Sequence, residues 1–209
     1  MEHSVTVELV DVTKYYENKC LFRNISKKLL PGECLTVTGP NGSGKSTLLK
    51  IISGLVKTSS GKINLRCNAN RLISPCERAK YIGFVSPELV FYKSLTGYEN
   101  IDFIAKASGM AALPEFIMAS LQRVGLSGQA HEPVINYSTG MRQRLKFALL
   151  LVLNPPLWLL DEPSSNLDTA GKKLVADLIH KALTRSTSII LATNEAEEAN
   201  YAHQKINLA

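Results

Sequence analysis

The chain has 209 residues, of which 45% are hydrophobic and 20% charged, and its formal net charge at pH 7 is +6. These proportions are typical of an ordinary globular domain that buries its own core. The longest uninterrupted apolar run covers residues 147–153, far short of the roughly 20 residues that cross a bilayer, and the N-terminus does not resemble a secretory signal. We therefore expect a cytoplasmic chain that neither spans a membrane nor is secreted.

The cysteines and the positive charge favour no special chemistry. The four cysteines, Cys20, Cys34, Cys67 and Cys76, lack CxxC spacing, so reduced thiols are expected rather than a zinc site or disulfides. The basic residues between positions 14 and 28 alternate with apolar residues instead of forming a block, and no aromatic-rich nucleic-acid motif accompanies them. The sequence thus argues against a specific nucleic-acid partner.

The first half of the chain predicts strands separated by turn residues, with helices after them. Short apolar runs bounded by glycine, proline or polar residues identify the strands. The expected strands cover residues 5–10, 20–30, 34–38, 62–65 and 81–85. The third strand runs into a glycine-rich loop and a helix at 45–55, and a helical block is expected at 97–125, where Pro114 opens the second helix.

The second half alternates between helix and strand. The expected elements are helices at 138–153 and 169–183, strands at 157–160 and 188–193, and a short terminal helix. Both strands are continuous apolar runs, as strands buried on two faces are. The pattern predicts an α/β fold with a parallel core sheet, an antiparallel β lobe and a helical lobe near residues 97–153, all in a single domain of residues 1–209.

A phosphate-binding loop is the most specific motif. Residues 39–47 match GxxxxGK[ST] in full, between an expected strand and an expected helix. Glycines let consecutive N–H groups surround phosphates, the helix dipole adds positive potential, Lys45 reaches the β and γ oxygens, and Ser46 can ligate Mg²⁺. The predicted nucleotide-binding residues here are Gly39, Pro40, Asn41, Gly42, Ser43, Gly44, Lys45, Ser46 and Thr47.

Two adjacent acids, Asp161 and Glu162, follow the apolar strand at 157–160. Ligands of open α/β sheets bind outside the carboxyl ends of the strands, where the phosphate loop also lies. We expect Asp161 to hold Mg²⁺ through a water, and Glu162 to orient and deprotonate the attacking water.

A third motif lies between these two. Residues 137–144 read YSTGMRQR, a small-residue turn that opens a helix, and residues 164–168 read SSNLD. The order GPNGSGKST, YSTGMRQR, LLDEP and SSNLD resembles the ABC ATPase family over essentially the whole chain. Ser138 also fits an ordinary helix N-cap, which uses the same exposed N–H groups.

The resemblance implies that two ATP molecules lie between two copies of the domain. Ser138 and Gly140 match the signature loop that clamps the γ-phosphate held by the opposite subunit, and residues 164–168 match a loop that crosses the interface. Tyr16 stands where the family stacks an aromatic ring on adenine; packing on the β lobe is the alternative for Tyr15 and Tyr16. ATP and Mg²⁺ are the implied cofactors, and a homodimer or heterodimer of ATPase subunits is the implied assembly.

Three positions depart from the family pattern. The signature reads YSTGM instead of LSGGQ, so Thr139 and Met141 replace a glycine and a glutamine. Pro87 stands where the family has a glutamine. Proline has no side-chain amide to donate a hydrogen bond or bind Mg²⁺, although Glu88 can take the place of the glutamine if the loop shifts by one residue. Asn194 replaces a histidine; it can donate to a γ-phosphate but carries no proton near neutral pH. The expected catalytic residues are Glu162, Lys45 and Asn194, and turnover by the isolated chain is expected to be slow.

The resemblance further implies an ATPase that powers transport by separate membrane-spanning permease subunits, with this chain peripheral on the cytoplasmic face. In the family a groove takes a helix of the membrane subunit, so Phe91, Tyr92 and Leu95 are candidate contacts; packing within the lobe is the alternative. A soluble ATPase of the iron–sulfur assembly type and a P-loop small-molecule kinase are the competing functions. The chain is similar to small exporter-type subunits, including the haem-exporter ATPase of cytochrome c maturation.

Overall fold

The computed structural model describes residues 4–17, 19–67, 70–195 and 198–208. The chain divides into two compact units. Unit 1 consists of Met1–Phe84, Pro155–Glu162 and Ile179–Ala209, and unit 2 consists of Val85–Asn154 and Pro163–Leu178. No helix within the described ranges is long and apolar enough to cross a membrane.

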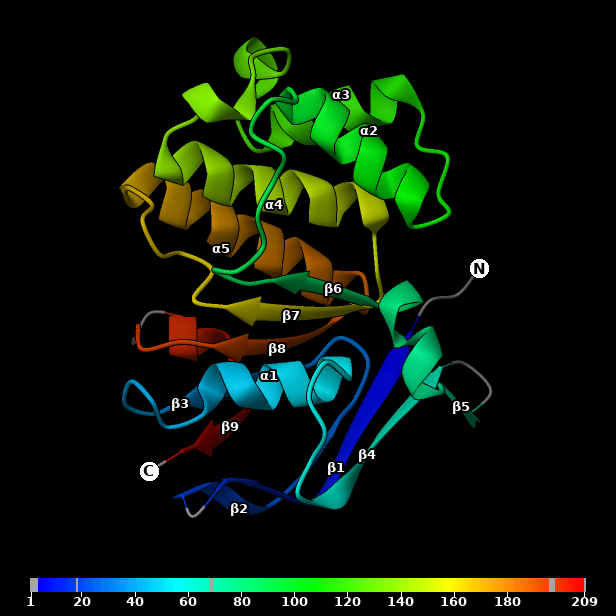
Figure 1. Ribbon diagram of the computed structural model, residues 1–209, viewed down its shortest axis with the longest axis vertical. Helices are drawn as coiled ribbons and strands as arrows, with labels where there is room; N and C mark the ends of the chain where they lie inside the picture. The colour runs from blue at the N-terminus through cyan, green and yellow to red at the C-terminus, as the bar shows by residue number, and fades with distance from the viewer. Residues whose placement is uncertain (1–3, 18, 68–69, 196–197, 209) are drawn as a thin grey trace. The chain divides into compact units, whose positions relative to one another are not determined.

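Unit 1 contains an antiparallel sheet with the strand order β2-β1-β4-β5 (Figure 1). Its strands are β1 (Val5–Tyr16), β2 (Lys19–Leu29), β4 (Ser60–Cys67) and β5 (Arg71–Leu72). In β1 the alternate residues Val5, Val7 and Leu9 are buried and the residues between them are more exposed, as the period of two in a strand requires. The expected antiparallel β lobe is confirmed.

The second sheet has the strand order β6-β7-β8-β3-β9. Its strands are β3 (Cys34–Thr38), β6 (Ile82–Val85), β7 (Leu157–Asp161), β8 (Ser188–Ala192) and β9 (Gln204–Asn207). The pairs β7–β8, β8–β3 and β3–β9 are parallel, and β7 and β8 consist entirely of buried residues. Helix α1 (Lys45–Ser53) adds Leu48, Leu49 and Ile52 to the same core. The predicted α/β class with a parallel core sheet is therefore confirmed.

A buried arginine binds a backbone carbonyl group at the C-terminal end of α1. The 3₁₀ helix η2 (Pro75–Lys80) carries Arg78, which donates to the carbonyl oxygens of Ile52 (3.0 Å) and Ile63 (2.9 Å). The last carbonyls of a helix have no partner within the helix. Arg78 therefore satisfies the end of α1 and joins it to β4.

Unit 2 is helical. Its elements are α2 (Gly97–Ala107), α3 (Pro114–Arg123), η3 (Ser127–Gln129), η4 (Val134–Asn136), α4 (Thr139–Leu153) and the first part of α5 (Thr169–Thr184). The side chains of Thr96 and Ser138 accept from the N–H groups of Glu99 and Met141, so the two residues cap α2 and α4. The two expected helices at 97–125 are confirmed, separated by a non-helical link at residues 108–113.

The C-terminal segment differs from the expected short helix. A 3₁₀ turn, η5 (Glu198–Tyr201), is followed by β9, which pairs in parallel with β3 from Leu35↔Gln204 to Thr38↔Asn207. Strand β9 has a single buried residue, Ile206, so its own sequence gives little indication of a strand. It becomes a strand because it pairs with the edge of β3. Residues 196 and 197 lie outside the described part of the chain. Elements β5 and η2 are also absent from the prediction.

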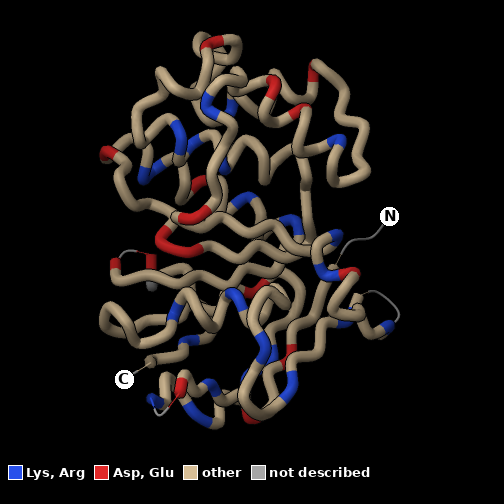
Figure 2. Tube along the Cα trace, in the orientation of Figure 1, with Lys and Arg blue, Asp and Glu red and all other residues tan. Residues whose placement is uncertain are grey.

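Basic residues are spread along the trace (Figure 2). Two exposed ion pairs join Arg71 to Glu77 (3.1 Å) and Lys106 to Asp102 (2.7 Å). Pairs at such exposure each contribute at most about 1 kcal/mol. These two ion pairs therefore add little to the stability of the fold.

Candidate active site

The phosphate-loop motif lies between β3 and α1, beyond the carboxyl end of an interior strand of the parallel sheet. Gly39 has φ +147°, and a Cβ at this position would lie 2.2 Å from the carbonyl oxygen of Leu208. Gly44 has φ +102°, and its Cβ would lie 3.0 Å from the ring of Phe22. Both positions therefore require glycine, which is the permissive backbone that the motif predicts.

Lys45 begins α1 and is only 6% exposed. Its ammonium group donates to the carbonyl oxygens of Gly39 (2.8 Å) and Pro40 (3.2 Å), both in the same loop. A buried ammonium needs such partners because its desolvation is costly. The loop thus holds a positive charge at the place where the motif predicts phosphate oxygens.

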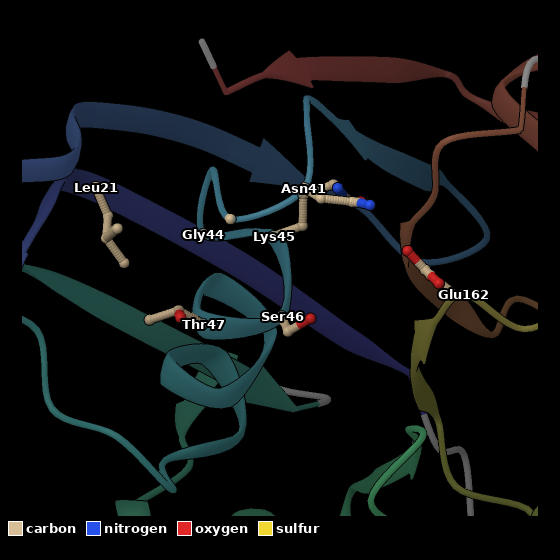
Figure 3. A pocket seen from close by; sticks show the side chains of 8 residues that line it. Leu21, Asn41, Gly44, Lys45, Ser46, Thr47 and Glu162 are labelled. Atoms are coloured by element: carbon tan, nitrogen blue, oxygen red, sulfur yellow. The ribbon is translucent and has the colours of Figure 1, made fainter.

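A cavity of about 430 Å³ opens beside this loop (Figure 3). Its lining residues are Leu21, Asn41, Gly42, Gly44, Lys45, Ser46, Thr47 and Glu162. The loop and α1 supply most of the wall, and Glu162 comes from the end of β7 on another side (Figure 3). The structure therefore brings the predicted phosphate loop and one of the two predicted acids to one cavity. Leu21, on β2, is an apolar wall residue that the sequence does not single out.

Asp161, the last residue of β7, is 3% exposed, and its Oδ1 has no hydrogen-bond partner. Burial raises the pKa of the Asp161 carboxyl, and the negative charge of Glu162 acts in the same direction. A hydrogen bond from Ser46 and the charge of Lys45 oppose that rise in pKa. An unpartnered carboxylate oxygen beside a serine hydroxyl is a donor set that suits a hard divalent cation, so these residues fit Mg²⁺.

Glu162 adopts a left-handed backbone conformation, with φ +47°. Its N–H donates to the carbonyl oxygen of Ala192 (2.9 Å), which extends the pairing of β7 with β8 by one residue. A non-glycine residue in this region costs on the order of 1 kcal/mol or more, and such residues are frequent at functional sites. The neighbouring strand thus holds the strained turn that directs Glu162 to the cavity.

Asn194 follows β8, the strand adjacent to β3 in the sheet. Its side-chain Nδ2 donates to Oδ1 of Asn41 in the phosphate loop at 2.8 Å. The structure therefore places the residue that replaces the expected histidine against the phosphate loop. The partner of Asn194 is a finding of the tertiary structure, because 153 positions separate the two residues.

Tyr16 lies at the end of β1 and is about half exposed, and Lys14 Nζ lies 4.6 Å from the centre of its ring. Arg23 covers the ring of Tyr15 in a similar way, at 5.5 Å. Both rings are accessible and already carry a cation on one face. The apolar wall of the cavity is formed by Leu21 and not by Tyr16.

In unit 2, the signature segment packs on the loop of residues 164–168. Ser138 caps α4 through its hydroxyl, and a Cβ on Gly140 would lie 3.3 Å from the carbonyl oxygen of Asn166. The buried Gln143 donates to the carbonyl oxygen of Pro163 at 2.7 Å. The two loops that the resemblance assigns to a dimer interface are therefore neighbours within unit 2.

Two further residues organise the segment from Ser86 to Leu95. The buried Lys146 of α4 donates to the carbonyl oxygen of Ser86 at 2.8 Å, and burial lowers the pKa of Lys146. Asn100 is fully buried and its side-chain amide binds both the N–H and the carbonyl group of Tyr92. Neither residue was predicted from the sequence, although a polar residue at a buried helix position is a signal of such a structural role.

The three candidate contacts for a membrane subunit differ in burial. Phe91 is 5% exposed, Leu95 is partly buried and Tyr92 is 56% exposed. Tyr92 packs edge-on against Phe103, with 5.3 Å between ring centres. Phe91 is therefore a core residue, which is the alternative that the sequence left open, and Tyr92 is available at the surface.

Comparison with known sequences gives a consistent family. Residues 22–165 match the family described as ABC transporter. The chain is 34% identical over 178 residues to the cytochrome c biogenesis ATP-binding export protein CcmA of Rhizobium meliloti, a match that covers 84% of each chain. It is 37% identical over 183 residues to an uncharacterized ABC transporter ATP-binding protein, YdbJ, of Bacillus subtilis, covering 87% of this chain but 58% of that relative.

Solved structures agree with this result. A dimeric ATP-binding cassette in a post-hydrolysis state with ADP and Pi superposes with a TM-score of 0.85 at 26% identity, covering 97% of this chain and 94% of that one. A bacterial Atm1-family ABC exporter with ATP bound superposes with a TM-score of 0.83 at 20% identity, covering 100% of this chain and 38% of that one. Because its sequence identity is only 20%, the second match supports the fold alone.

Proposed function

The chain belongs to the ABC transporter family of ATPases, and on this premise we propose that it hydrolyses Mg–ATP as a dimer to power transport by separate membrane-spanning permease subunits. The observation that carries the proposal is the cavity in which the phosphate loop, Lys45 and Glu162 meet. Units 1 and 2 would together make a single nucleotide-binding domain. The chain would act at the cytoplasmic face of the membrane.

The phosphates of ATP would bind along the loop of residues 39–47. Lys45 already faces two backbone carbonyls, and phosphate oxygens are stronger acceptors that can replace them. The glycines at positions 39 and 44 keep the space free that a side chain would fill. The loop would therefore bind phosphate with backbone N–H groups, the N-terminus of α1 and one ammonium.

Ser46 and Asp161 would hold Mg²⁺. Their fit rests on the unpartnered Oδ1 of Asp161 and on the raised pKa of that carboxyl, which a cation would lower again. When bound, Mg²⁺ neutralises charge on the β- and γ-phosphate oxygens. The protein contributes the ligands and a buried, preorganised place for them.

Glu162 would position and deprotonate the water that attacks the γ-phosphorus. Its strained backbone and its hydrogen bond to Ala192 fix the direction of the carboxylate at the cavity wall. Asn194 would donate an amide hydrogen to the γ-phosphate. Preorganised donors of this kind lower the barrier because they need no reorganisation during the reaction.

Tyr16 would stack on adenine, with its exposed ring and the charge of Lys14 both available to the base. Ser138 and Gly140 would clamp the γ-phosphate that is bound by the second subunit, using N–H groups at the start of α4. The packing of this segment on residues 164–168 supports a common role at an interface. Homodimer and heterodimer are both compatible with this arrangement.

The relatives are named as an ABC transporter ATP-binding protein or as ATP-binding export proteins. These names favour a transporter over an iron–sulfur assembly ATPase or a small-molecule kinase. Several of them are named cytochrome c biogenesis ATP-binding export proteins, at 34–38% identity, which supports export as the direction of transport. Tyr92, exposed beside Phe103, would contact the membrane subunit.

The test is ATP binding and turnover by the purified chain, compared with Lys45→Ala. We expect the wild type to bind Mg–ATP and hydrolyse it slowly, and the variant to lose most of its affinity because it lacks the only side-chain cation that this proposal assigns to the phosphates. Equal affinity of the two proteins would overturn the phosphate-loop assignment. Copurification with a hydrophobic permease would test the transport assignment separately.

A further inference from the structure

The side-chain contact between Asn194 and Asn41 connects two loops of unit 1. Strands β3 and β8 are parallel neighbours, paired from Cys34↔Ile189 to Val37↔Ala192. The loops that follow them therefore start side by side, and the N–H of Thr193 still donates to the carbonyl oxygen of Val37 at 3.1 Å. Asn41 and Asn194 extend this pairing into the active-site loops through their side chains.

The backbone on both sides of the contact is held in place. In the phosphate loop, the N–H of Ser43 donates to the carbonyl oxygen of Pro40 at 3.1 Å, which closes a turn around Asn41. After β8, the N–H of Glu195 donates to Oγ1 of Thr193 at 2.9 Å, which fixes the turn that carries Asn194. The direction of each Asn side chain thus starts from a defined backbone.

The contact uses one of two hydrogens on the same nitrogen. A side-chain amide has two N–H bonds that point about 120° apart in one plane, and Asn41 Oδ1 accepts one of them. The terminal torsion of an asparagine is otherwise broad, so this bond selects one orientation of the amide plane. The second N–H then has a fixed direction too.

We propose that Asn41 is a positioning residue for Asn194: it accepts one amide hydrogen of Asn194 and so directs the other to the γ-phosphate. The inference deepens the proposed function and rests on it. Asparagine is shorter than the histidine expected at this position and more free to rotate, and the contact with Asn41 removes that freedom. Asn41 also lines the cavity, so the pair lies at the edge of the space that the phosphates would occupy.

A double-mutant cycle on the full chain tests this role. The proteins are the wild type, Asn41→Ala, Asn194→His and the double variant, with Asn64→Ala as a control that removes an amide contact to Glu8 on the antiparallel sheet. Turnover at saturating Mg–ATP and affinities for ATP and ADP are measured for each. Asn41→Ala removes one hydrogen bond, the one that Asn194 donates to Asn41. The net contribution of a single hydrogen bond corresponds to a change of about three- to tenfold, so we expect turnover in the wild-type background to fall by that factor. In the Asn194→His background, where the longer ring reaches the phosphate without Asn41, the loss is expected to stay below about twofold.

The ADP affinity separates positioning from loop support. If Asn41 acts only through Asn194, ADP affinity stays unchanged in all variants, because ADP has no γ-phosphate. An equal loss of turnover in both backgrounds, a loss of ADP affinity, or no loss in the wild-type background would overturn the inference while leaving the proposed ATPase function intact. A wild-type chain that does not bind ATP would overturn both.

Discussion

Replacing Asp161 by asparagine should stabilise the metal-free protein. Asp161 is 3% exposed and its Oδ1 has no hydrogen-bond partner, so the folded state contains a poorly solvated carboxylate. Asparagine would still leave one polar atom without a partner at the position of Oδ1, so the gain comes only from removing the buried charge, on the order of 1–2 kcal/mol. For a chain of this length, 1 kcal/mol corresponds to about 2–4 °C in Tm. We therefore expect Asp161→Asn to raise Tm by roughly 2–8 °C at pH 8 in EDTA.

The direction of the pKa shift gives this gain a pH dependence. Burial raises the pKa of the Asp161 carboxyl above its ordinary value of 3.8, so between the two values the folded protein binds more protons than the unfolded chain. The contribution of this group to stability is thus fully present below pH 3.8 and is lost as the pH rises through the higher pKa. The stability difference between Asp161→Asn and the wild type should therefore grow from pH 4 to pH 8.

Thermal unfolding at both pH values measures this, with and without Mg²⁺ and ADP. The exposed Asp177→Asn is the matched control, because it removes a carboxylate charge without changing a buried group. Mg²⁺ with ADP should raise the Tm of the wild type more than that of Asp161→Asn. A variant that is less stable than the wild type at pH 8, or a stability difference that does not change with pH, would refute this account of Asp161.

Three other substitutions probe separate parts of the structure. Glu162→Gln should keep ATP binding and stop turnover, trapping an ATP-dependent dimer; hydrolysis by a chain that stays monomeric in gel filtration with ATP would exclude Glu162 as the base. Arg78→Met should lower the free energy of unfolding by about 2–4 kcal/mol in urea titrations, because it leaves the carbonyls of Ile52 and Ile63 unsatisfied; a loss below about 0.5 kcal/mol would contradict this. Tyr92→Glu should abolish copurification with the permease at unchanged ATP affinity, and loss of folding instead would assign Tyr92 to the core.

The local motifs made most of the cavity wall predictable. Residues 39–47 specify a phosphate loop because glycine at positive φ and a following helix are local requirements, and the structure has both at Gly44 and α1. The buried strands β7 and β8 were equally predictable, since continuous apolar runs are typical of strands covered on both faces. The sequence order of the motifs was also sufficient to indicate the family.

What the sequence by itself determined are features that depend on neighbouring residues: the phosphate loop, the helix cap at Ser138, and the alternation of strands and helices. Only the tertiary structure decided the pairing of β9 with β3, the contact of Asn194 with Asn41, and the isolation of Asp161 Oδ1. These depend on strand order and on burial, which bring together residues up to about 170 positions apart. No periodicity within a segment reports such partners, because their energy comes from contacts that exist only once the sheet has formed.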